Sequence, residues 1–299
     1  MWKFEVTQKR FEIGKVGVGG HPGEYPTVLI GSIFYRRHKI VTDEWTGEFD
    51  RSMAEHAINV QDDFSDRTGN PCMVDVVAST PEAMIKYLDF AAKVSDSPLL
   101  IGGATPEARL AGLNYALKSG LADRVIYNSL TPSSSKDELE KIKAAGLKNA
   151  VLLAANLKNF TSEGRIRAVE ELLPALSAAG VERLLVDTFV LDIPSLGQAF
   201  KAIYEVKNKF GLPAGCGAHN AVATWKGLKM KMGKQASKPA LASASATVAT
   251  GGADFILYGP IEDAPIVFPV VAMVNVALGQ LLVEKGVRLP KVHPRYKVG

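Results

Sequence analysis

The sequence predicts a closed (β/α)8 barrel, and three observations lead to that prediction. Short apolar runs alternate with helical stretches along most of the chain, a pattern typical of parallel strands joined by right-handed crossovers. Eight strand–helix units follow one another from Thr27 onward, and no change in composition marks a linker between them. The chain has 299 residues, a length that one barrel often reaches. We therefore expect one domain over residues 1–299.

The first residues precede the barrel. Residues 1–26 carry an alternating segment and many glycines and prolines, so we expect an N-terminal extension that contains a small hairpin. The strand that follows is expected over 27–35, then a polar loop over 36–47 and a helix over about 49–65.

The later units repeat one pattern of a short buried strand and a capped helix. Thr80 and Thr105 each stand directly before a proline, which predicts a threonine N-cap and a proline in the first helical position. The expected strands are 71–78, 99–103, 124–128, 149–155, 183–190, 214–220 and 254–258. The expected helices begin at 80 and 105 and then cover about 135–145, 163–179, 195–209, several segments up to 250, and 265–285.

Polar side chains stand where three of these strands end. They are Asp187, Asn128 and Asn220. Ligands of parallel α/β folds bind outside the carboxyl ends of the strands, and one carboxylate with two carboxamides suits a flat, nitrogen-rich heterocycle. The other interpretation is that each residue caps a helix or shapes a loop, which is common for Asp and Asn. Three such residues at equivalent positions favour a binding site.

Composition and charge exclude several classes of protein. The net charge is +4 with scattered Lys and Arg, which does not indicate nucleic-acid binding. Cys72 and Cys216 form no CxxC pair and no disulfide framework, so a reducing cytoplasm fits. The N-terminus lacks the apolar core of a signal peptide, and no uncharged apolar run is expected to reach the length of a membrane span. We expect a cytoplasmic protein without membrane insertion.

Several kinds of catalytic motif are absent from the sequence. His38, His56, His219 and His293 lack the spacing of zinc ligands, so we expect no metal site. The chain has no phosphate-loop lysine motif, no dinucleotide fingerprint and no Gly-x-Ser-x-Gly elbow. Lys158, after the fifth strand, is interpreted as a solvated lysine rather than a Schiff-base lysine.

Four motifs resemble those of one known family. They are the segment 19–35, Thr-Gly-Asn-Pro at 68–71, Ile-Tyr-Asn-Ser at 126–129 and Gly-Pro-Ile-Glu at 259–262. Over about residues 19–280 the chain resembles the H subunit of tetrahydromethanopterin S-methyltransferase, which implies a TIM barrel of the pterin-binding methyltransferase type. With no expected membrane segment and a basic balance, the resemblance favours the soluble bacterial branch. That branch includes the glycine betaine demethylation methyltransferase, which moves a methyl group between a methylated corrinoid protein and tetrahydrofolate.

The resemblance also implies pterin-binding residues. Asn128–Ser129, Asp187–Thr188 and Gly217–Asn220 match the Asn-Ser, Asp-Pro/Thr and Gly-x-x-Asn motifs of pterin-binding methyltransferases, which implies that they bind the pyrimidine edge of the pterin. Many relatives end the third strand in Asp-Ser-Thr, where this chain has Gly102, Gly103 and Ala104 before its threonine. Either Asp75 supplies the missing carboxylate, or the two glycines let the ring approach backbone amides. Asp75 as a supporting or loop residue is a further interpretation.

The implied reaction is a methyl displacement between N5 of tetrahydrofolate and methylcobalamin carried by a partner corrinoid protein. Demethylated N5 needs a proton, and Asn220 and Asp187 are the candidates to position the water that handles it. The alternatives are a tetrahydromethanopterin methyltransferase subunit within a larger complex, and a pterin-binding synthase such as dihydropteroate synthase, whose basic motifs this chain does not match.

Two surface features predict partners. The helix expected over 265–285 is apolar nearly all round, which predicts a homodimer unless the N-terminal extension covers it. Lys226 and Lys229 are interpreted either as a solvated helix face or as contacts for folate carboxylates or an acidic rim on the corrinoid protein.

Overall fold

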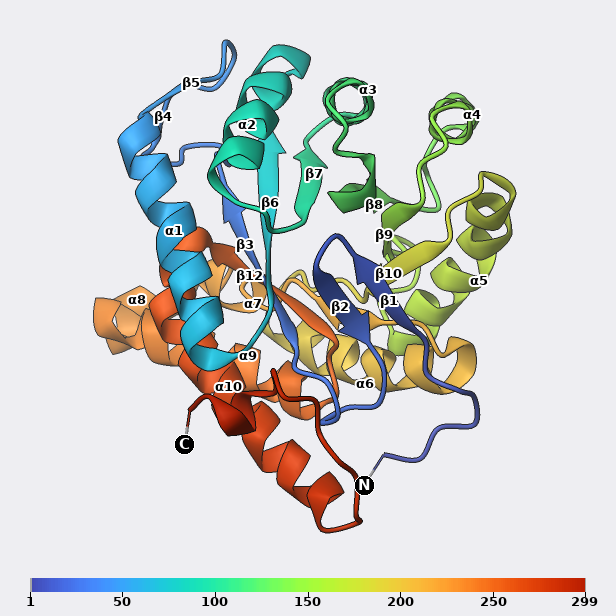
Figure 1. The fold of residues 1–299 in the computed structure, drawn as a ribbon, viewed down its shortest axis with the longest axis vertical. Coiled ribbons are helices and arrows are strands. Elements are labelled where there is room, and N and C mark those ends of the chain that lie inside the picture. Colours follow the sequence, from blue (N-terminus) through green and yellow to red (C-terminus); the bar gives the residue numbers. More distant parts are fainter. Residues whose placement is uncertain (1, 299) are drawn as a thin grey trace.

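The computed structural model describes residues 2–298, and its centre is a closed barrel of parallel strands (Figure 1). The barrel strands are β3 (Val28–Ile33), β6 (Cys72–Ala78), β7 (Leu99–Gly103), β8 (Val125–Leu130), β9 (Asn149–Leu153), β10 (Arg183–Asp187), β11 (Ala214–Cys216) and β12 (Phe255–Pro260). Each strand pairs with the next in parallel, and β12 pairs with β3 to close the ring. The prediction of a (β/α)8 barrel is confirmed.

Helices form the outer layer of the barrel (Figure 1). The long ones are α1 (Arg51–Thr68), α2 (Pro81–Val94), α3 (Pro106–Lys118), α4 (Lys136–Ala144), α5 (Ser162–Ala178), α6 (Ile193–Phe210), α9 (Ser237–Thr250) and α10 (Ala264–Val283). Two short helices, α7 (Asn220–Ala223) and α8 (Lys226–Met232), lie between β11 and α9. The hydroxyls of Thr80 and Thr105 accept hydrogen bonds from the amides of Ala83 and Ala108, so both predicted N-caps are confirmed.

Several segments differ from the prediction, and the strands expected over 149–155 and 183–190 end earlier, at Leu153 and Asp187. The loop expected over 36–47 contains a short strand, β4 (Val41–Asp43), which pairs antiparallel with β5 (Glu48–Phe49) directly after the loop. The strand expected over 214–220 ends at Cys216, because the Gly217 carbonyl accepts a hydrogen bond from the Asn220 amide (3.1 Å) and turns the chain out of the sheet. Asn220 is therefore the first residue of α7 and not the last of a strand.

The N-terminal extension contains the expected hairpin, formed by β1 (Arg10–Ile13) and β2 (Val16–Gly19). Ile13, Val16 and Val18 are buried against the inner core of the barrel. The rest of that inner core consists of Val28, Ile30, Met73, Leu100, Ile126, Val151, Leu185, Phe255 and Leu257. Most of these stand in the early part of their strands, so the hairpin closes the lower end of the barrel and leaves the carboxyl ends open for a site.

α10 is the helix that was expected over 265–285. It packs between α1 and α9, and Val267, Phe268 and Val271 are buried in the wall. The expectation that no uncharged run reaches the length of a membrane span is wrong, because α10 is uncharged over 20 residues. In the part of the chain that the structure describes, it is the one helix long and apolar enough to cross a membrane by length and composition. A helix of the barrel wall that packs against neighbours on two sides is also apolar, because much of its surface is buried.

Candidate active site at the upper mouth

The upper mouth is the end of the barrel at which the carboxyl ends of the strands lie. The alternation of side chains along each strand determines which of them face this mouth. The inner core contains Ile30, Met73, Leu100, Ile126 and Leu185. Since side chains alternate along a strand, the residues two positions further on also point inward. These residues are Ser32, Asp75, Gly102, Asn128 and Asp187. The same step from Val151 reaches Leu153, so the mouth is mostly polar, and Gly102 leaves an inward position without a side chain.

Asp75 is buried and accepts hydrogen bonds at both carboxylate oxygens. The Ser32 hydroxyl donates to Oδ2 at 2.8 Å, and the Asn128 side-chain amide donates to Oδ1 at 3.0 Å. Burial raises the pKa of Asp75, and these two hydrogen bonds oppose that shift. Each carboxylate oxygen has two lone pairs, so Asp75 keeps acceptor capacity for a ligand. Of the interpretations left open by the sequence, this geometry supports a residue of the mouth over a loop residue.

Asp187 ends β10 on the far side of the barrel from Asp75. Its Oδ1 accepts a hydrogen bond from the Phe189 amide at 2.8 Å, at a turn where Phe189 has φ +61°. Burial raises the pKa of Asp187 from 3.8 to about 6, and the negative charge of Asp75 adds to that rise. The backbone amides of Phe189 and Gly217 and the charge of Arg165 oppose it.

Neither Asp187 nor Asn128 caps the helix that follows its strand. The N-cap of α6 is Asp192, and the N-cap of α4 is Ser135. The helix-capping interpretation is therefore wrong for both residues, and their side chains remain in the mouth. Asn220 is neither a helix cap nor the last residue of a strand, because it lies within the first turn of α7.

Asn220 nevertheless reaches the mouth, because its side chain lies over Gly217. A Cβ added to Gly217 would stand 3.0 Å from the Asn220 amide nitrogen. The same Gly217 amide favours the charged form of Asp187, so Asn220 and Asp187 share one neighbourhood. In the described part of the chain no hydrogen bond engages the Asn220 side-chain amide, which leaves its donors and acceptor to a ligand or to water.

The two glycines of β7 leave room beside Asp75. A Cβ at Gly102 would lie 2.4 Å from Asp75 Oδ1, so any larger residue would displace that carboxylate. At Gly103 the added Cβ would meet Arg109, whose guanidinium binds the Gly103 carbonyl at 3.0 Å. Ser129 follows Asn128 through a cis peptide bond and is half-buried. A carboxylate side chain at position 102 would occupy the space that Asp75 fills here.

Three further residues support the mouth and were not predicted from the sequence. Ser32 holds Asp75, as described above. Arg165 of α5 is fully buried and donates to the carbonyls of Thr188 (2.6 Å) and Phe189 (3.0 Å), which fixes the turn behind Asp187. The strand alternation signals Ser32, but no local pattern signals Arg165, since its partners are set by the tertiary fold.

His219 is the third of these residues. Its Nδ1 lies 3.0 Å from the Leu257 carbonyl, and burial lowers the pKa of the ring. The neutral ring therefore donates from Nδ1 and keeps Nε2 as an acceptor. A Cβ at Gly259 would stand 2.8 Å from the His219 ring, which explains the glycine that opens the Gly-Pro-Ile-Glu motif. The glutamate of that motif, Glu262, accepts from His38 Nε2 at 2.9 Å.

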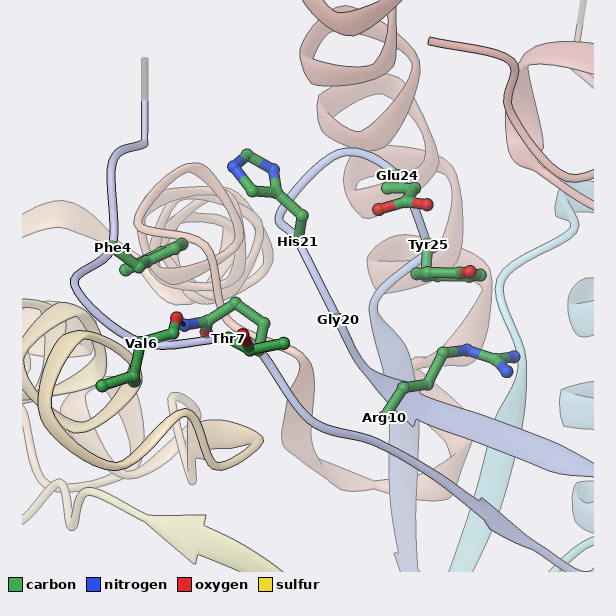
Figure 2. Close-up of a pocket in the computed structure, with 9 residues that line it drawn as sticks. Phe4, Val6, Thr7, Arg10, Gly20, His21, Glu24 and Tyr25 are labelled. Atoms are coloured by element: carbon green, nitrogen blue, oxygen red, sulfur yellow. Dashed lines mark hydrogen bonds between the residues drawn. The ribbon is translucent and has the colours of Figure 1, made fainter.

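A pocket at the opposite end of the barrel is not the active site. It has a volume of about 420 Å³ and is lined by the N-terminal extension, where the Arg10 guanidinium lies over the Tyr25 ring (Figure 2). Ligand chemistry in this fold takes place at the carboxyl ends of the strands, which are at the other mouth. The described residues contain no group of three or more His, Cys, Asp or Glu side chains that could hold a metal ion.

Comparison with known proteins decides the family. The family model described as tetrahydromethanopterin S-methyltransferase MtrH subunit matches residues 6–289. The chain belongs to the MtrH family. Its MtrH relatives include the H subunit of tetrahydromethanopterin S-methyltransferase from Methanothermobacter thermautotrophicus, which is 37% identical over 100% of both chains. The H subunit of the putative methyltransferase mtx from Methanosarcina barkeri is 35% identical, and the match covers 98% of each chain.

Solved structures show that the MtrH barrel is shared more widely. Dihydropteroate synthase of Yersinia pestis, solved with a pterine-sulfa conjugate, is similar with a TM-score of 0.63 and 14% identity. The match covers 90% of this chain and 99% of that one. At this identity the similarity concerns the fold alone. The predicted family is thus confirmed for MtrH, while the soluble bacterial branch stays a prediction.

Proposed function

We propose that the protein is a methyltransferase that binds a reduced pterin in its upper mouth and exchanges the N5 methyl group with a corrinoid carried by a partner protein. The observation that supports this most is the inward cluster of Asp75, Asn128 and Asp187 in a chain of the MtrH family. The chain needs no metal of its own for this reaction, because N5, water and the partner's corrinoid supply the reacting groups.

The mouth suits the pyrimidine edge of a pterin. That edge presents N–H donors beside a carbonyl oxygen and a ring nitrogen, and carboxylates with carboxamides match both. Asp187 and Asp75 accept hydrogen bonds from the donors of this edge, while Asn128 and Ser129 donate hydrogen bonds to its acceptors. Each charge-assisted hydrogen bond contributes roughly 1.5–3 kcal/mol in such a water-poor site. Gly102 and Gly103 leave space for the flat ring.

We assign the handling of the proton at N5 to Asn220 and Asp187. When a methyl group leaves N5, the electron pair of the broken N–C bond stays on N5, which then takes a proton from water. Asn220 and Asp187 are both neighbours of Gly217 and are proposed to position that water. The acceptor of the methyl group is the partner's reduced corrinoid, which supplies the electron pair of the new bond.

The identity of the pterin has two candidates. The names of the relatives favour tetrahydromethanopterin, the pterin of the alternative prediction from the sequence. Tetrahydrofolate, the substrate of the soluble bacterial branch, is the second candidate and is favoured by the basic balance of the chain. A synthase reaction is not proposed, since the similarity to dihydropteroate synthase concerns the fold.

Two surfaces accompany this proposal. The corrinoid protein would dock over the upper mouth, where Leu157 and Met230 are 74% and 82% exposed on the segments that surround it. A homodimer would form over the outer face of α10, where Met273 is 64% exposed. We place the protein in the cytoplasm, where Cys72 and Cys216 would remain free thiols.

The test is a methyl-transfer assay with the purified chain and cob(I)alamin. Methyl-tetrahydromethanopterin and methyl-tetrahydrofolate are offered in parallel, and methylcobalamin is followed by its absorbance. Transfer from either pterin supports the proposal, and the preferred one identifies the substrate. No transfer from both, with binding of neither by calorimetry, would refute the pterin site.

A further inference from the structure

A second pocket, of about 570 Å³, opens beside the upper mouth. It is formed by α7, α8, the short 3-10 turn η2 (Lys234–Ala236), α9 and the loop after β12. Four lysines line it, namely Lys226, Lys229, Lys234 and Lys238. The only carboxylate among its lining residues is that of Asp263. The pocket is therefore strongly positive.

The charges of these lysines are not compensated within the described residues. None of the four forms an ion pair there, whereas other lysines do, such as Lys86 with Glu48 and Lys207 with Asp254. One carboxylate cannot neutralise four ammonium groups. The Ser237 hydroxyl, which also lines the pocket, is buried and has no hydrogen-bond partner in the described part of the chain. Both features indicate a ligand that brings negative charge and acceptor atoms.

The pocket adjoins the mouth at His219. This residue lines the pocket and directly precedes Asn220, whose side chain lies over Gly217. A ligand with its head in the mouth therefore extends past His219 into the pocket. The apolar lining, from Trp225, Leu228 and Leu241, suits an aryl stem that lies between the head and a charged end.

We infer that this pocket binds the anionic tail of the pterin substrate, a chain of carboxylate or phosphate groups carried on an aryl stem. The inference rests on the proposed function. Glutamate carboxylates of tetrahydrofolate and the phosphate- and carboxylate-bearing tail of tetrahydromethanopterin share this chemistry. A concave pocket fits such a tail better than it fits the acidic rim of a docked protein, which would meet lysines on a convex surface.

The experiment compares ligands that differ only in the tail. Dissociation constants are measured by calorimetry for 6-methyltetrahydropterin, tetrahydrofolate, its triglutamate and tetrahydromethanopterin, at low and high salt. The variants are Lys229→Glu and, as a matched control, Lys231→Glu. Both lysines are exposed on α8, but Lys231 does not line the pocket. The four ligands separate the pterin head from the two kinds of tail.

The expected result is a tail-specific loss of affinity. Lys229→Glu weakens the preferred tailed ligand roughly tenfold, the loss shrinks at high salt, and 6-methyltetrahydropterin binds the variant as it binds the parent. Lys231→Glu changes each constant less than about twofold, as expected of an exposed charge outside the site.

Other outcomes overturn the inference and identify what failed. If 6-methyltetrahydropterin binds the parent but no tailed ligand distinguishes the variants, the tail subsite is wrong and the pterin site stands. If Lys231→Glu weakens tailed ligands as much as Lys229→Glu does, the affinity for the tail comes from the long-range electrostatic field of the surface lysines and not from binding in the pocket. If both variants bind all pterins normally but lose transfer to the corrinoid protein alone, the lysines serve that partner. If the parent binds no pterin, the proposed function itself fails.

Discussion

Replacing Asp187 with asparagine should stabilise the empty protein while it weakens pterin binding. In the unfolded chain an Asp side chain loses its proton near pH 3.8, whereas in the folded protein Asp187 keeps it up to about pH 6. The folded state therefore binds more protons between these values, and its stability falls as the pH rises through this window. Asparagine cannot ionise, and its oxygen can still accept from the Phe189 amide.

The size of the effect follows from the shift. A difference of about 2.2 pKa units, from 3.8 to about 6, corresponds to about 3 kcal/mol at about 1.4 kcal/mol per unit. Urea denaturation followed by circular dichroism should thus show Asp187→Asn to be more stable by up to about 3 kcal/mol at pH 7.5 and by roughly half of that at pH 5. Its affinity for the pterin should fall roughly 10- to 100-fold, because a ligand donor loses a charged acceptor.

Asp192→Asn is the control for this experiment. Asp192 lies in the same loop and caps α6, and asparagine caps helices as well as aspartate does. This variant should leave the unfolding midpoint and the pterin affinity unchanged at both pH values. A variant Asp187→Asn that is no more stable than the parent at pH 7.5, or whose gain does not depend on pH, would refute the assignment of a buried, desolvated carboxylate.

Four further outcomes are expected. Pterin affinity of the parent should rise with pH through about 6 and level off above it, because the ionised Asp187 accepts the ligand's donors; calorimetry that shows no pH dependence would contradict this. Asn220→Ala should lower the transfer rate at least about tenfold and change the dissociation constant less than about threefold, by stopped-flow and calorimetry. Arg165→Met should lower the free energy of unfolding by about 3 kcal/mol or more, since buried carbonyls lose their donors, and an unchanged urea midpoint would refute that role. Met273→Asp should convert the proposed dimer to a monomer, as measured by light scattering. A parent protein that is already monomeric would refute the proposed dimer.

The sequence predicts most of the barrel because short apolar strands and threonine caps are local features. Asp187 and Asn128 can be identified for the same reason, since each follows a run whose alternation points it inward. Asn220 reaches the mouth from a helix and not from the predicted strand, because one backbone hydrogen bond at Gly217 ends that strand early. The turn depends on the packing of neighbouring strands, where a Cβ at Gly215 would stand 2.0 Å from the Phe255 carbonyl oxygen.

The parts of the site that the sequence did not predict depend on contacts between distant segments. The sequence leaves the role of Asp75 open because its partners Ser32 and Asn128 stand 43 and 53 residues away along the chain. Arg165 stands on α5 and binds carbonyls that follow a later strand, so neither periodicity nor a motif marks it. Buried polar groups of this kind are specified by the whole fold and not by their neighbours in sequence.

The hairpin of β1 and β2 changes where the folding unit begins. A boundary drawn before β3 would separate Ile13, Val16 and Val18 from the core that they complete. Removing three buried aliphatic side chains forfeits roughly 1.5–3 kcal/mol each, which together approaches the whole stability of an ordinary domain. The extension is held further by Lys207, whose ammonium group binds the Gly20 carbonyl at 3.0 Å and Asp254 at 2.6 Å. Truncated versions of this protein that start at the first barrel strand would therefore begin inside the domain.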